Sequence, residues 1–385
     1  MKQSNFKLKS SITYQKYCEE MNDFKLLDVT NFSKKLSKFH WAIDGGYGLI
    51  QIYYEYSQLN YKKIYPVLNC LHGFFPGMTY DWIKNSEASF KSIPVTLIHN
   101  DSHLNDFNYL FGKHKKFILI SNPYYYILDN YHNFLVNKND RSGSVLFLPH
   151  SIGLHSNITY DIDKILSYVI TNYKKYSPIT FCIHPNDINE NFIEKIKTKG
   201  FNVSCNGGRH DPKFLHRFFW LTHNKRYALM FDVSSHLELS VLSNLEIIRI
   251  PLDITYYLPI NGGTNEITTP KNIYWPIFEQ FYSNEINQKV LSDSVAITTG
   301  KNYFLYRNEL RNFILSIEYY YLKSKNITNS NKYYYKLHNK IEPYIIKFNK
   351  LLKAFGLRLS GMRGQQQIYF SDTYYKLIEN KKNNL

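Results

Sequence analysis

Val145-Leu-Phe-Leu148 is a short apolar run that ends at Pro149-His150-Ser151-Ile152-Gly153, and residues 160–173 follow with apolar side chains at helical spacing. An apolar run, a turn containing Pro and Gly, and an amphipathic segment predict strand, loop and helix in that order. The chain repeats this order as far as Pro251. The stretch from Gly143 to Pro251 therefore decides the fold.

The repeats place further strands at residues 179–183, 201–204, 227–231 and 246–250, and further helices at residues 188–199, 211–222 and 237–242. Gly200 is expected to close the first of these helices, because glycine adopts the left-handed conformation that many helix C-termini require. Strands that alternate with helices of this length indicate a parallel sheet covered on both faces. This part of the chain is predicted to be an α/β domain.

Polar pairs directly follow three of the predicted strands: His150-Ser151, His184-Pro185 and Ser234-Ser235. In open parallel sheets, ligands bind outside the carboxyl ends of the strands, because helix N-termini and free backbone amides converge there. We therefore expect the three pairs to face one ligand site. Structural roles are the alternative, since Ser234 is a typical helix N-cap residue and a residue before proline, such as His184, is confined to extended geometry.

The first third of the chain shows the same pattern of apolar strand and polar turn. Strands are expected at residues 39–43, 64–68, 94–98 and 117–120, with a helix at residues 49–59. Residues 137–144 are polar and form the most linker-like stretch before the second domain. We predict an N-terminal domain over residues 1–142, a second domain over residues 143–300, and a C-terminal helical and basic extension over residues 301–385. Two Rossmann-like halves of this kind face a central cleft, where ligands commonly bind.

The C-terminal extension is predicted to contain a helix over residues 302–321 and a basic amphipathic helix from Tyr344 to Leu359. A basic amphipathic helix can lie on an anionic membrane surface, or its apolar stripe can pack against the second domain. The sequence leaves both interpretations of Tyr344–Leu359 open.

The chain of 385 residues has 47 Lys and Arg against 31 Asp and Glu, which gives a formal net charge of +16. This charge favours an anionic partner such as a nucleotide donor, an acidic glycan or a phospholipid surface, although a biased gene composition produces the same excess. Binding to nucleic acid is disfavoured, because the 35 tyrosines are dispersed and no reader motif interleaves aromatic with basic residues.

Cysteine use and apolar runs bear on the cellular compartment. The four cysteines are scattered without a CxxC motif, which favours reduced thiols over a zinc site or a disulfide framework. Residues 1–17 lack the apolar core of a signal peptide, and no apolar run approaches the roughly 20 residues that cross a bilayer. We expect a cytoplasmic protein, either free or peripheral on the inner face of the cytoplasmic membrane.

The order of these motifs resembles a known group of enzymes. An acidic residue before glycine, then a strand-ending His-Pro, then a strand-ending Ser-Ser about fifty residues later are similar to the bacterial sialyltransferases and polysialyltransferases of the GT-B fold. The similarity extends more loosely to the Kdo transferases of capsule and lipopolysaccharide synthesis. The resemblance covers residues 40–250. It implies two Rossmann-like domains and a CMP-sugar as donor substrate, with no further cofactor.

The resemblance also implies roles for particular residues. Asp44 matches the base that deprotonates the acceptor hydroxyl, His184 matches the histidine that contacts the donor phosphate, and Ser234-Ser235 match the pair that binds the cytidylate phosphate. These families often carry two acidic residues before the glycine, whereas Ile43 precedes Asp44 in this chain. His72 stays the alternative base, because its His-Gly pair resembles that of teichoic-acid type transferases with CDP-activated donors.

Elementary chemistry points the same way without the resemblance. Transfer of a sugar from a nucleotide phosphate develops negative charge on the departing phosphate, which a divalent metal or protein donors can stabilise. No Asp-x-Asp triplet ends a predicted strand, since Asp161-Ile-Asp163 starts a helix, so protein donors are expected and no metal ligands. The expected donors are Ser234-Ser235 at a helix entrance and His184, which could supply a proton near neutral pH. Further donor-site candidates are His150, Ser151, Pro185, Arg209 and Glu238, the last of which is otherwise a surface helix carboxylate.

We therefore expect a metal-independent, inverting glycosyltransferase that moves a sialic-acid-like or Kdo-like sugar from a CMP-sugar to a surface glycan or glycolipid acceptor. A CDP-polyol phosphotransferase of teichoic-acid type is the alternative enzyme. A non-catalytic module that binds acidic glycan or membrane is the alternative outside enzymes. The three hypotheses differ in which cytidine nucleotide stabilises the chain and in whether a CMP-sugar is turned over.

Overall fold

The computed structural model describes residues 47–59, 68–70, 95–101, 104–105, 116–150, 157–158, 161–184, 187, 190–207, 213–252, 256–257 and 275–324. The chain separates into two compact units. The first, the β4–β9 unit, contains Tyr131–Asn265 and Phe281–Gln288, and the second, the β1–β3 unit, contains Lys38–Asn130, Glu266–Gln280 and Lys289–Leu385. Each unit carries a parallel sheet, so the expected α/β class is confirmed. The predicted domain boundaries at residues 142 and 300 stay predictions.

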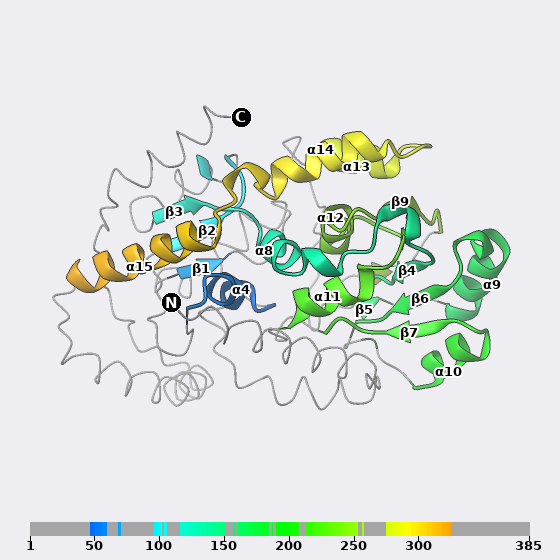
Figure 1. The fold of residues 1–385 in the computed structure, drawn as a ribbon. Coiled ribbons are helices and arrows are strands. Elements are labelled where there is room, and N and C mark those ends of the chain that lie inside the picture. The colour runs from blue at the N-terminus through cyan, green and yellow to red at the C-terminus, as the bar shows by residue number, and fades with distance from the viewer. Residues whose placement is uncertain are drawn as a thin grey trace, which may run out of the picture. The chain divides into compact units, whose positions relative to one another are not determined.

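The β4–β9 unit is built on the part of the chain that the sequence pattern singles out. Its sheet contains β4 (Ser144–Phe147), β6 (Ile179–Cys182), β7 (Asn202–Ser204), β8 (Tyr227–Met230) and β9 (Glu246–Arg249). The strands lie in the order β7-β6-β4-β8-β9, and all neighbours run parallel (Figure 1). Each of these strands overlaps one that the sequence predicts.

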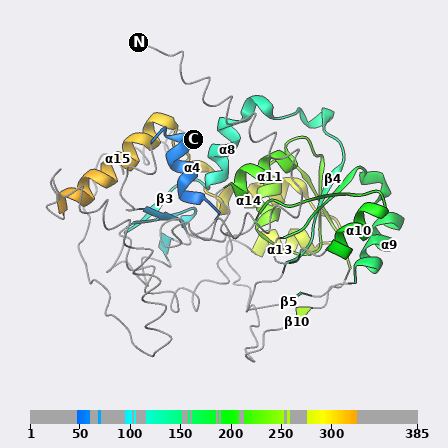
Figure 2. The same cartoon turned by 90° about the horizontal axis from the view of Figure 1, so that it is seen from below.

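Helices cover both faces of this sheet. They are α9 (Ile162–Asn172), α10 (Glu190–Thr198), α11 (Phe214–Thr222) and α12 (Ser235–Leu242). Figure 2 shows α9 and α10 on the opposite side of β4 from α11. Successive strand residues point to opposite faces, so Leu146 packs with the buried residues of α9 and α10 while Phe147 stacks on Phe218 of α11.

Two helix ends in this unit form as the sequence predicts. The Asp161 carboxylate accepts hydrogen bonds from the backbone N–H groups of Asp163 and Lys164, at 3.0 and 3.1 Å, and so caps the start of α9. Gly200 has a φ of +82° just beyond α10, where its N–H donates to the Lys197 carbonyl. The carboxylates of Asp161-Ile-Asp163 therefore serve a helix start, and Gly200 is the predicted C-terminal cap.

The strand order places a switch in chain direction between β4 and β8. From β4 the chain proceeds outward to β6 and β7, and it then returns to the other side of β4 to form β8 and β9. At such a switch the loops after the two central strands diverge, and ligands of open α/β sheets bind in the crevice between them. Residues following β4 and β8 are thus the first place to look for a site.

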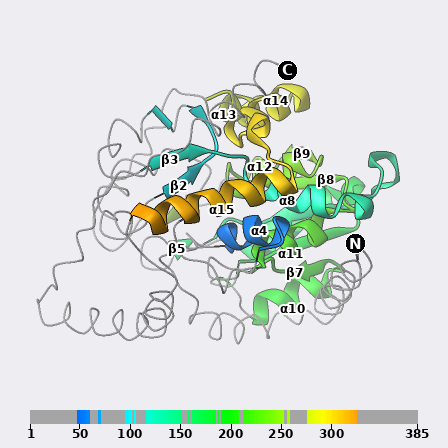
Figure 3. The same ribbon diagram turned by 60° about the vertical axis from the view of Figure 1, so that its left-hand side comes forward.

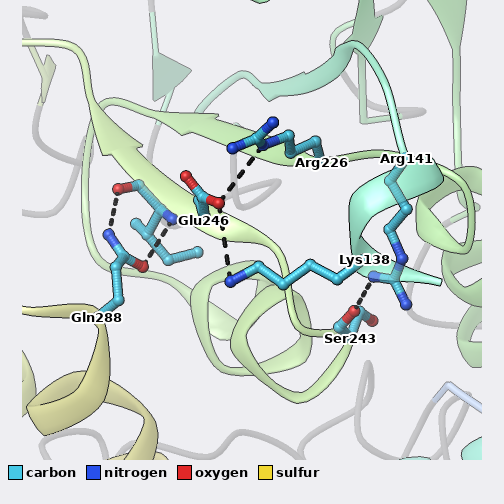
Figure 4. Close-up of polar contacts among 7 residues, drawn as sticks. Lys138, Arg141, Arg226, Ser243, Glu246 and Gln288 are labelled. Carbon is cyan, nitrogen blue, oxygen red and sulfur yellow. Dashed lines mark hydrogen bonds and ion pairs between the residues drawn. The ribbon is translucent and has the colours of Figure 1, made fainter.

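Side chains satisfy the outer edge of β9, which has no neighbouring strand among the described residues. The Gln288 amide donates to the Ile247 carbonyl at 2.9 Å and accepts from the Ile247 N–H at 3.0 Å, as a paired strand would (Figure 4). Glu246 forms ion pairs with Lys138 at 3.7 Å and Arg226 at 3.5 Å. The Gln288 amide occupies backbone groups of Ile247 that would otherwise be open to pairing with another chain.

The remaining elements of this unit are short. Strands β5 (Asn157–Ile158) and β10 (Tyr256–Tyr257) form an antiparallel pair that the sequence pattern did not predict. Single 3₁₀ turns occur at η3 (His132–Phe134), η4 (Lys138–Asp140) and η5 (Lys174–Tyr176). Beyond η4, the buried Arg141 side chain donates to the Val136 and Ser243 carbonyls, at 2.8 and 2.6 Å, and fixes the approach to β4.

The β1–β3 unit contains a second parallel sheet with the order β1-β2-β3. Its strands are β1 (Leu68–Cys70), β2 (Val95–Ile98) and β3 (Lys116–Leu119), and α4 (Leu49–Tyr56), α8 (Pro123–Asn130), η7 (Lys301–Tyr303) and α15 (Arg307–Ser324) accompany them. Helix α15 lies beside α4 (Figure 3). Most of α14 (Gln288–Thr298) belongs to this unit, and the division between the units falls within α13 (Trp275–Tyr282).

Buried tyrosines form much of the core of the β1–β3 unit. Tyr53, Tyr124 and Tyr126 have no exposed surface, and the Tyr53 and Tyr126 rings meet edge to face at 5.2 Å. A buried phenol needs a hydrogen-bond partner, and the Tyr53 hydroxyl donates to the Ser121 carbonyl at 2.8 Å. Part of the tyrosine content therefore has a structural role.

A segment of the same chain closes the carboxyl ends of β2 and β3. Asn100 Nδ2 donates to the Thr298 carbonyl at 3.2 Å, Ser121 Oγ donates to the Gly300 carbonyl at 2.6 Å, and the Asn122 N–H donates to the Thr299 carbonyl at 2.9 Å. These polar residues follow predicted strands, as the ligand-site candidates do. Here they bind residues 298–300 of the chain itself.

Several sequence-based expectations fall outside the described residues. They include the basic amphipathic helix at Tyr344–Leu359 and the turn that carries Asp44. Of the predicted strand at residues 64–68, only Leu68 is described, at the start of β1. Among the described residues, no helix combines the length and the apolar character needed to pass through a bilayer.

Candidate functional site

Four of the predicted site residues gather at the carboxyl ends of β4, β6 and β8. His150 lies three residues beyond β4, His184 two beyond β6, and Ser234-Ser235 at the start of α12 after β8. The His150 and His184 rings stack with their centroids 4.4 Å apart and their planes 24° apart. Two strand ends that are far apart in sequence thus contribute one pair of imidazoles beside the switch between β4 and β8.

Burial makes both imidazoles of this pair weak bases. Desolvation, and then the nearby imidazoles of His150 and His236, lower the pKa of His184 to about 3. Desolvation also lowers the pKa of His150, and the Asp187 carboxylate opposes this shift. His184 is therefore neutral at pH 7 in the free chain, contrary to the expectation that it titrates near neutrality. A neutral imidazole still donates one N–H hydrogen bond, and a bound anion would raise its pKa.

His236, in the first turn of α12, is a third imidazole of this cluster. Its ring stacks on Phe147 with the centroids 4.6 Å apart and lies 5.9 Å from the Phe218 ring. Burial, and then the charge of His150, lower the pKa of His236 to about 3. Although His236 directly follows the Ser-Ser pair, the sequence analysis did not select it. Its position immediately after a strand-end motif was the available signal.

Hydrogen bonds fix the tautomer of His236. The Cys182 thiol, whose pKa is raised by burial, donates to Asn206 Oδ1 at 3.4 Å, so Asn206 Nδ2 faces His236 Nε2 at 3.3 Å. An amide nitrogen only donates, so Nε2 must be the unprotonated acceptor and the ring proton must lie on Nδ1. The Nδ1–H group of His236 is then directed away from Asn206 as a donor.

The serine pair occupies the start of α12 without capping it. Ser234 has an extended backbone at the N-cap position, but its hydroxyl makes no capping hydrogen bond. The interpretation of Ser234 as a side-chain cap is therefore wrong. The first N–H groups of a helix lack partners within the helix and carry the positive end of its dipole, so Ser234-Ser235 sit where an anion is stabilised.

The loop before the serine pair is held by residues that the sequence analysis also did not select. Asp232, two residues beyond β8, accepts hydrogen bonds from the Tyr282 hydroxyl and from the Val233 N–H. The Arg249 guanidinium, at the end of β9, lies over the Tyr282 ring at 4.9 Å. The sequence offered no signal for Tyr282, which lies about fifty residues further along the chain.

Glu238 lies one turn into α12 and is fully buried, with 0% of its surface exposed. The alternative that Glu238 is a solvent-exposed helix carboxylate is therefore wrong. Its position on the first turn of α12 places it close to the serine pair in sequence. Contact with a donor ribose would require the side chain to become accessible, so this role stays a prediction.

The other predicted site residues are outside the described part of the chain. They are Asp44, His72, Ser151, Pro185 and Arg209. Their roles stay predictions. Within the described residues, no group of three or more His, Cys, Asp or Glu side chains is arranged to hold a metal ion.

A second strand-end pair lies in the β1–β3 unit and is fully enclosed. Cys70 Sγ lies 3.5 Å from His99 Nε2, and His99 Nδ1 lies 2.9 Å from the Ile120 carbonyl. The carbonyl only accepts, so Nδ1 carries the proton and the thiol donates to Nε2. Burial lowers the pKa of His99 to about 4, so it also stays neutral at pH 7. The enclosed pair stabilises the strand ends rather than facing solvent.

Comparisons with known proteins give little further information. No protein-family model and no curated protein matches the chain. Among solved structures, it is similar to UGT71G1 of Medicago truncatula complexed with UDP-glucose, at 10% identity and a TM-score of 0.26. The match covers 66% of this chain and 55% of the solved chain, so it spans about half of that protein. A TM-score this low carries no argument about fold or activity.

Proposed function

We propose that this chain is a glycosyltransferase of GT-B organisation that transfers an acidic, sialic-acid-like or Kdo-like sugar from a CMP-sugar to a glycan or glycolipid acceptor. One observation carries the proposal: His150, His184 and Ser234-Ser235 converge at the switch point of a parallel sheet. The strand order and the ligand position it favours are those of nucleotide-binding α/β domains.

The chemistry of the cluster suits a nucleotide phosphate. Serine hydroxyls, imidazole N–H groups and the first N–H groups of α12 are all hydrogen-bond donors, and donors to a phosphate make strong charge-assisted bonds. The imidazoles are neutral in the free chain, so no fixed positive charge has to be desolvated before the ligand binds. The formal net charge of +16 would attract an anionic nucleotide over longer distances.

The transfer step uses these donors on the leaving group. The acceptor hydroxyl oxygen attacks the anomeric carbon, and the bond between this carbon and the phosphate oxygen breaks with its electron pair going to the phosphate. Ser234-Ser235 and His184 stabilise the charge that develops on the released CMP. The acceptor proton passes to a base, for which Asp44 is proposed and His72 is the alternative. Attack opposite to the leaving group inverts the anomeric configuration.

The proposed activity is tested by following CMP release from a CMP-activated sialic acid and from CMP-Kdo, with CDP-glycerol as the probe for the alternative phosphotransferase. His184→Ala and the double variant Ser234→Ala/Ser235→Ala are expected to lower kcat/KM by about 10²- to 10³-fold, as losses of transition-state donors do. His132→Ala is the matched control, because His132 is an exposed histidine of the same unit. Turnover that stays unchanged in both site variants would refute the proposed site.

The proposed base is tested in the same assay. Asp44→Asn or His72→Gln should lower kcat/KM, and the affinity for CMP should stay within about threefold, since a base acts on the acceptor. Loss of activity in only one of the two variants would identify the base. Full activity in both would remove this part of the proposal.

A membrane partner through Tyr344–Leu359 is a separate part of the proposal. The sequence predicts a helix with an apolar stripe opposite Lys347, Lys350 and Lys353, an arrangement that suits an anionic lipid surface. Cosedimentation with vesicles that contain phosphatidylglycerol should fall when the three lysines are replaced by glutamate. Equal cosedimentation of both forms would contradict this attachment.

A further inference from the structure

Tyr282 forms an exposed aromatic surface beside the serine pair. Its hydroxyl donates to the Asp232 carboxylate, just beyond the end of β8. Arg249, at the end of β9, donates from Nη1 to the Tyr282 carbonyl at 3.3 Å and places its guanidinium over the ring. The tyrosine is thus held at its hydroxyl, at its backbone and on one side of its ring.

Tyr282 is restrained by these contacts although 45% of its surface is exposed. Large aromatic side chains bury considerable area when a flat ligand covers them, and a ring fixed in advance loses little entropy on binding. The guanidinium beneath the ring adds a cation–π contact that helps to keep it in place. The hydroxyl stays a donor to Asp232, because burial and this hydrogen bond raise the pKa of Tyr282.

The position of Tyr282 relates it to the proposed phosphate site. Asp232 and Ser234 are two residues apart, so their Cα atoms lie within about 7 Å of each other. In a nucleotide, one ribose separates the phosphate from the base. A phosphate on the serine pair would therefore leave the base within reach of the ring.

We propose that Tyr282 is the stacking platform for the nucleobase of the nucleotide whose phosphate binds at Ser234-Ser235. This inference rests on the proposed function, since it takes the serine pair as the phosphate site. It assigns Tyr282 a role in ligand binding and Arg249 a role in positioning the ring. The base gains affinity through its face, whereas the phosphate is bound by the serines and imidazoles.

The test compares CMP, ribose 5-phosphate and inorganic phosphate as ligands of wild type, Tyr282→Ala and Tyr282→Phe, by calorimetry. Ribose 5-phosphate has the sugar and phosphate of CMP without the base. Stacking of a base on an aromatic ring contributes an affinity gain of about 5- to 150-fold. Tyr282→Ala should lose this factor for CMP and bind ribose 5-phosphate within about twofold of wild type. Tyr282→Phe keeps the ring and should bind CMP within about threefold of wild type.

The outcomes separate this inference from the proposed function. The stacking role is wrong if Tyr282→Ala binds CMP with wild-type affinity. It is also wrong if the variant loses affinity for CMP and for ribose 5-phosphate by the same factor. In both cases the phosphate site stands. If wild type binds none of the three compounds, the proposed function fails and the platform fails with it. Melting curves of both variants show whether a lost affinity reflects an unfolded chain.

Discussion

The β4–β9 unit should lose stability in mild acid because of two of its histidines. His184 and His236 have pKa values lowered to about 3 in the folded chain, whereas a histidine in an unfolded chain has a pKa of about 6.5. Between these two values the unfolded chain binds more protons than the folded chain. The free energy of unfolding therefore falls as the pH drops below about 6.5. Above that value these histidines are neutral in both states and cause no loss of stability.

The size of this loss in the free energy of unfolding depends on how far the pH lies below the pKa of the unfolded histidine. A pH of 5 lies about 1.5 units below the pKa of an unfolded imidazole, and each unit corresponds to about 1.36 kcal/mol. Each neutral histidine in the folded state then lowers the free energy of unfolding by about 2 kcal/mol between pH 7.5 and pH 5. The pair together would lower it by about 4 kcal/mol, a large part of the stability of an ordinary domain.

Urea denaturation at pH 7.5, 6.0 and 5.0 measures this effect. In His184→Gln or His236→Gln one of the two proton-binding groups is absent, so the fall in unfolding free energy should be about 2 kcal/mol smaller than in wild type. Packing losses act at every pH and cancel in the comparison. The exposed His132→Gln serves as control and should keep the wild-type dependence. A wild-type dependence in both site variants would refute the burial argument.

Other changes test the structure more locally. Gln288→Ala removes two hydrogen bonds to the edge strand β9 and should lower the free energy of unfolding by about 1–3 kcal/mol in urea denaturation. Gly300→Ala should destabilise the chain more than Gly200→Ala. Both positions have a positive φ, which costs an alanine about 1–2 kcal/mol. Of the two, only Gly300 would bring the added Cβ against a backbone oxygen, at 2.2 Å. Asn206→Asp puts a carboxylate beside His236 and should raise the pKa of that imidazole, as followed by NMR.

Each of these changes has a contradicting outcome. Lys289→Ala, on an exposed residue next in sequence, is the control for the edge strand and should shift stability by less than about 0.5 kcal/mol. Equal losses of stability in Gln288→Ala and Lys289→Ala would contradict a stabilising contact between Gln288 and the edge of β9. Equal losses in the two glycine variants would contradict the close approach at Gly300. An unchanged pKa in the aspartate variant would contradict the contact between residue 206 and the His236 ring.

The β4–β9 sheet was predictable because its signals are local. Each strand is a short apolar run closed by a polar or proline-containing turn, and the helices show apolar residues at helical spacing. The same local patterns placed His150, His184 and Ser234-Ser235 at strand ends. The strand order, and with it the switch point between β4 and β8, comes from tertiary pairing, which periodicity does not encode.

The parts that were not predicted depend on residues distant in sequence. Asn100 follows a strand, as the site residues do, yet its partner is the Thr298 carbonyl, 198 positions away. His236 was not selected although it directly follows the Ser-Ser pair, because its contact with Asn206, 30 positions earlier, cannot be deduced from the local pattern. A strand-end polar residue indicates a site only when no other segment of the chain covers it.

The position of CMP in a crystal structure tests the central claim most directly. The phosphate should lie within hydrogen-bond distance of the Ser234 and Ser235 hydroxyls and of an imidazole N–H from His150, His184 or His236, with the base on the Tyr282 ring. Density for CMP elsewhere, with this cluster empty at saturating nucleotide, would contradict the proposal that the strand-end cluster binds the donor.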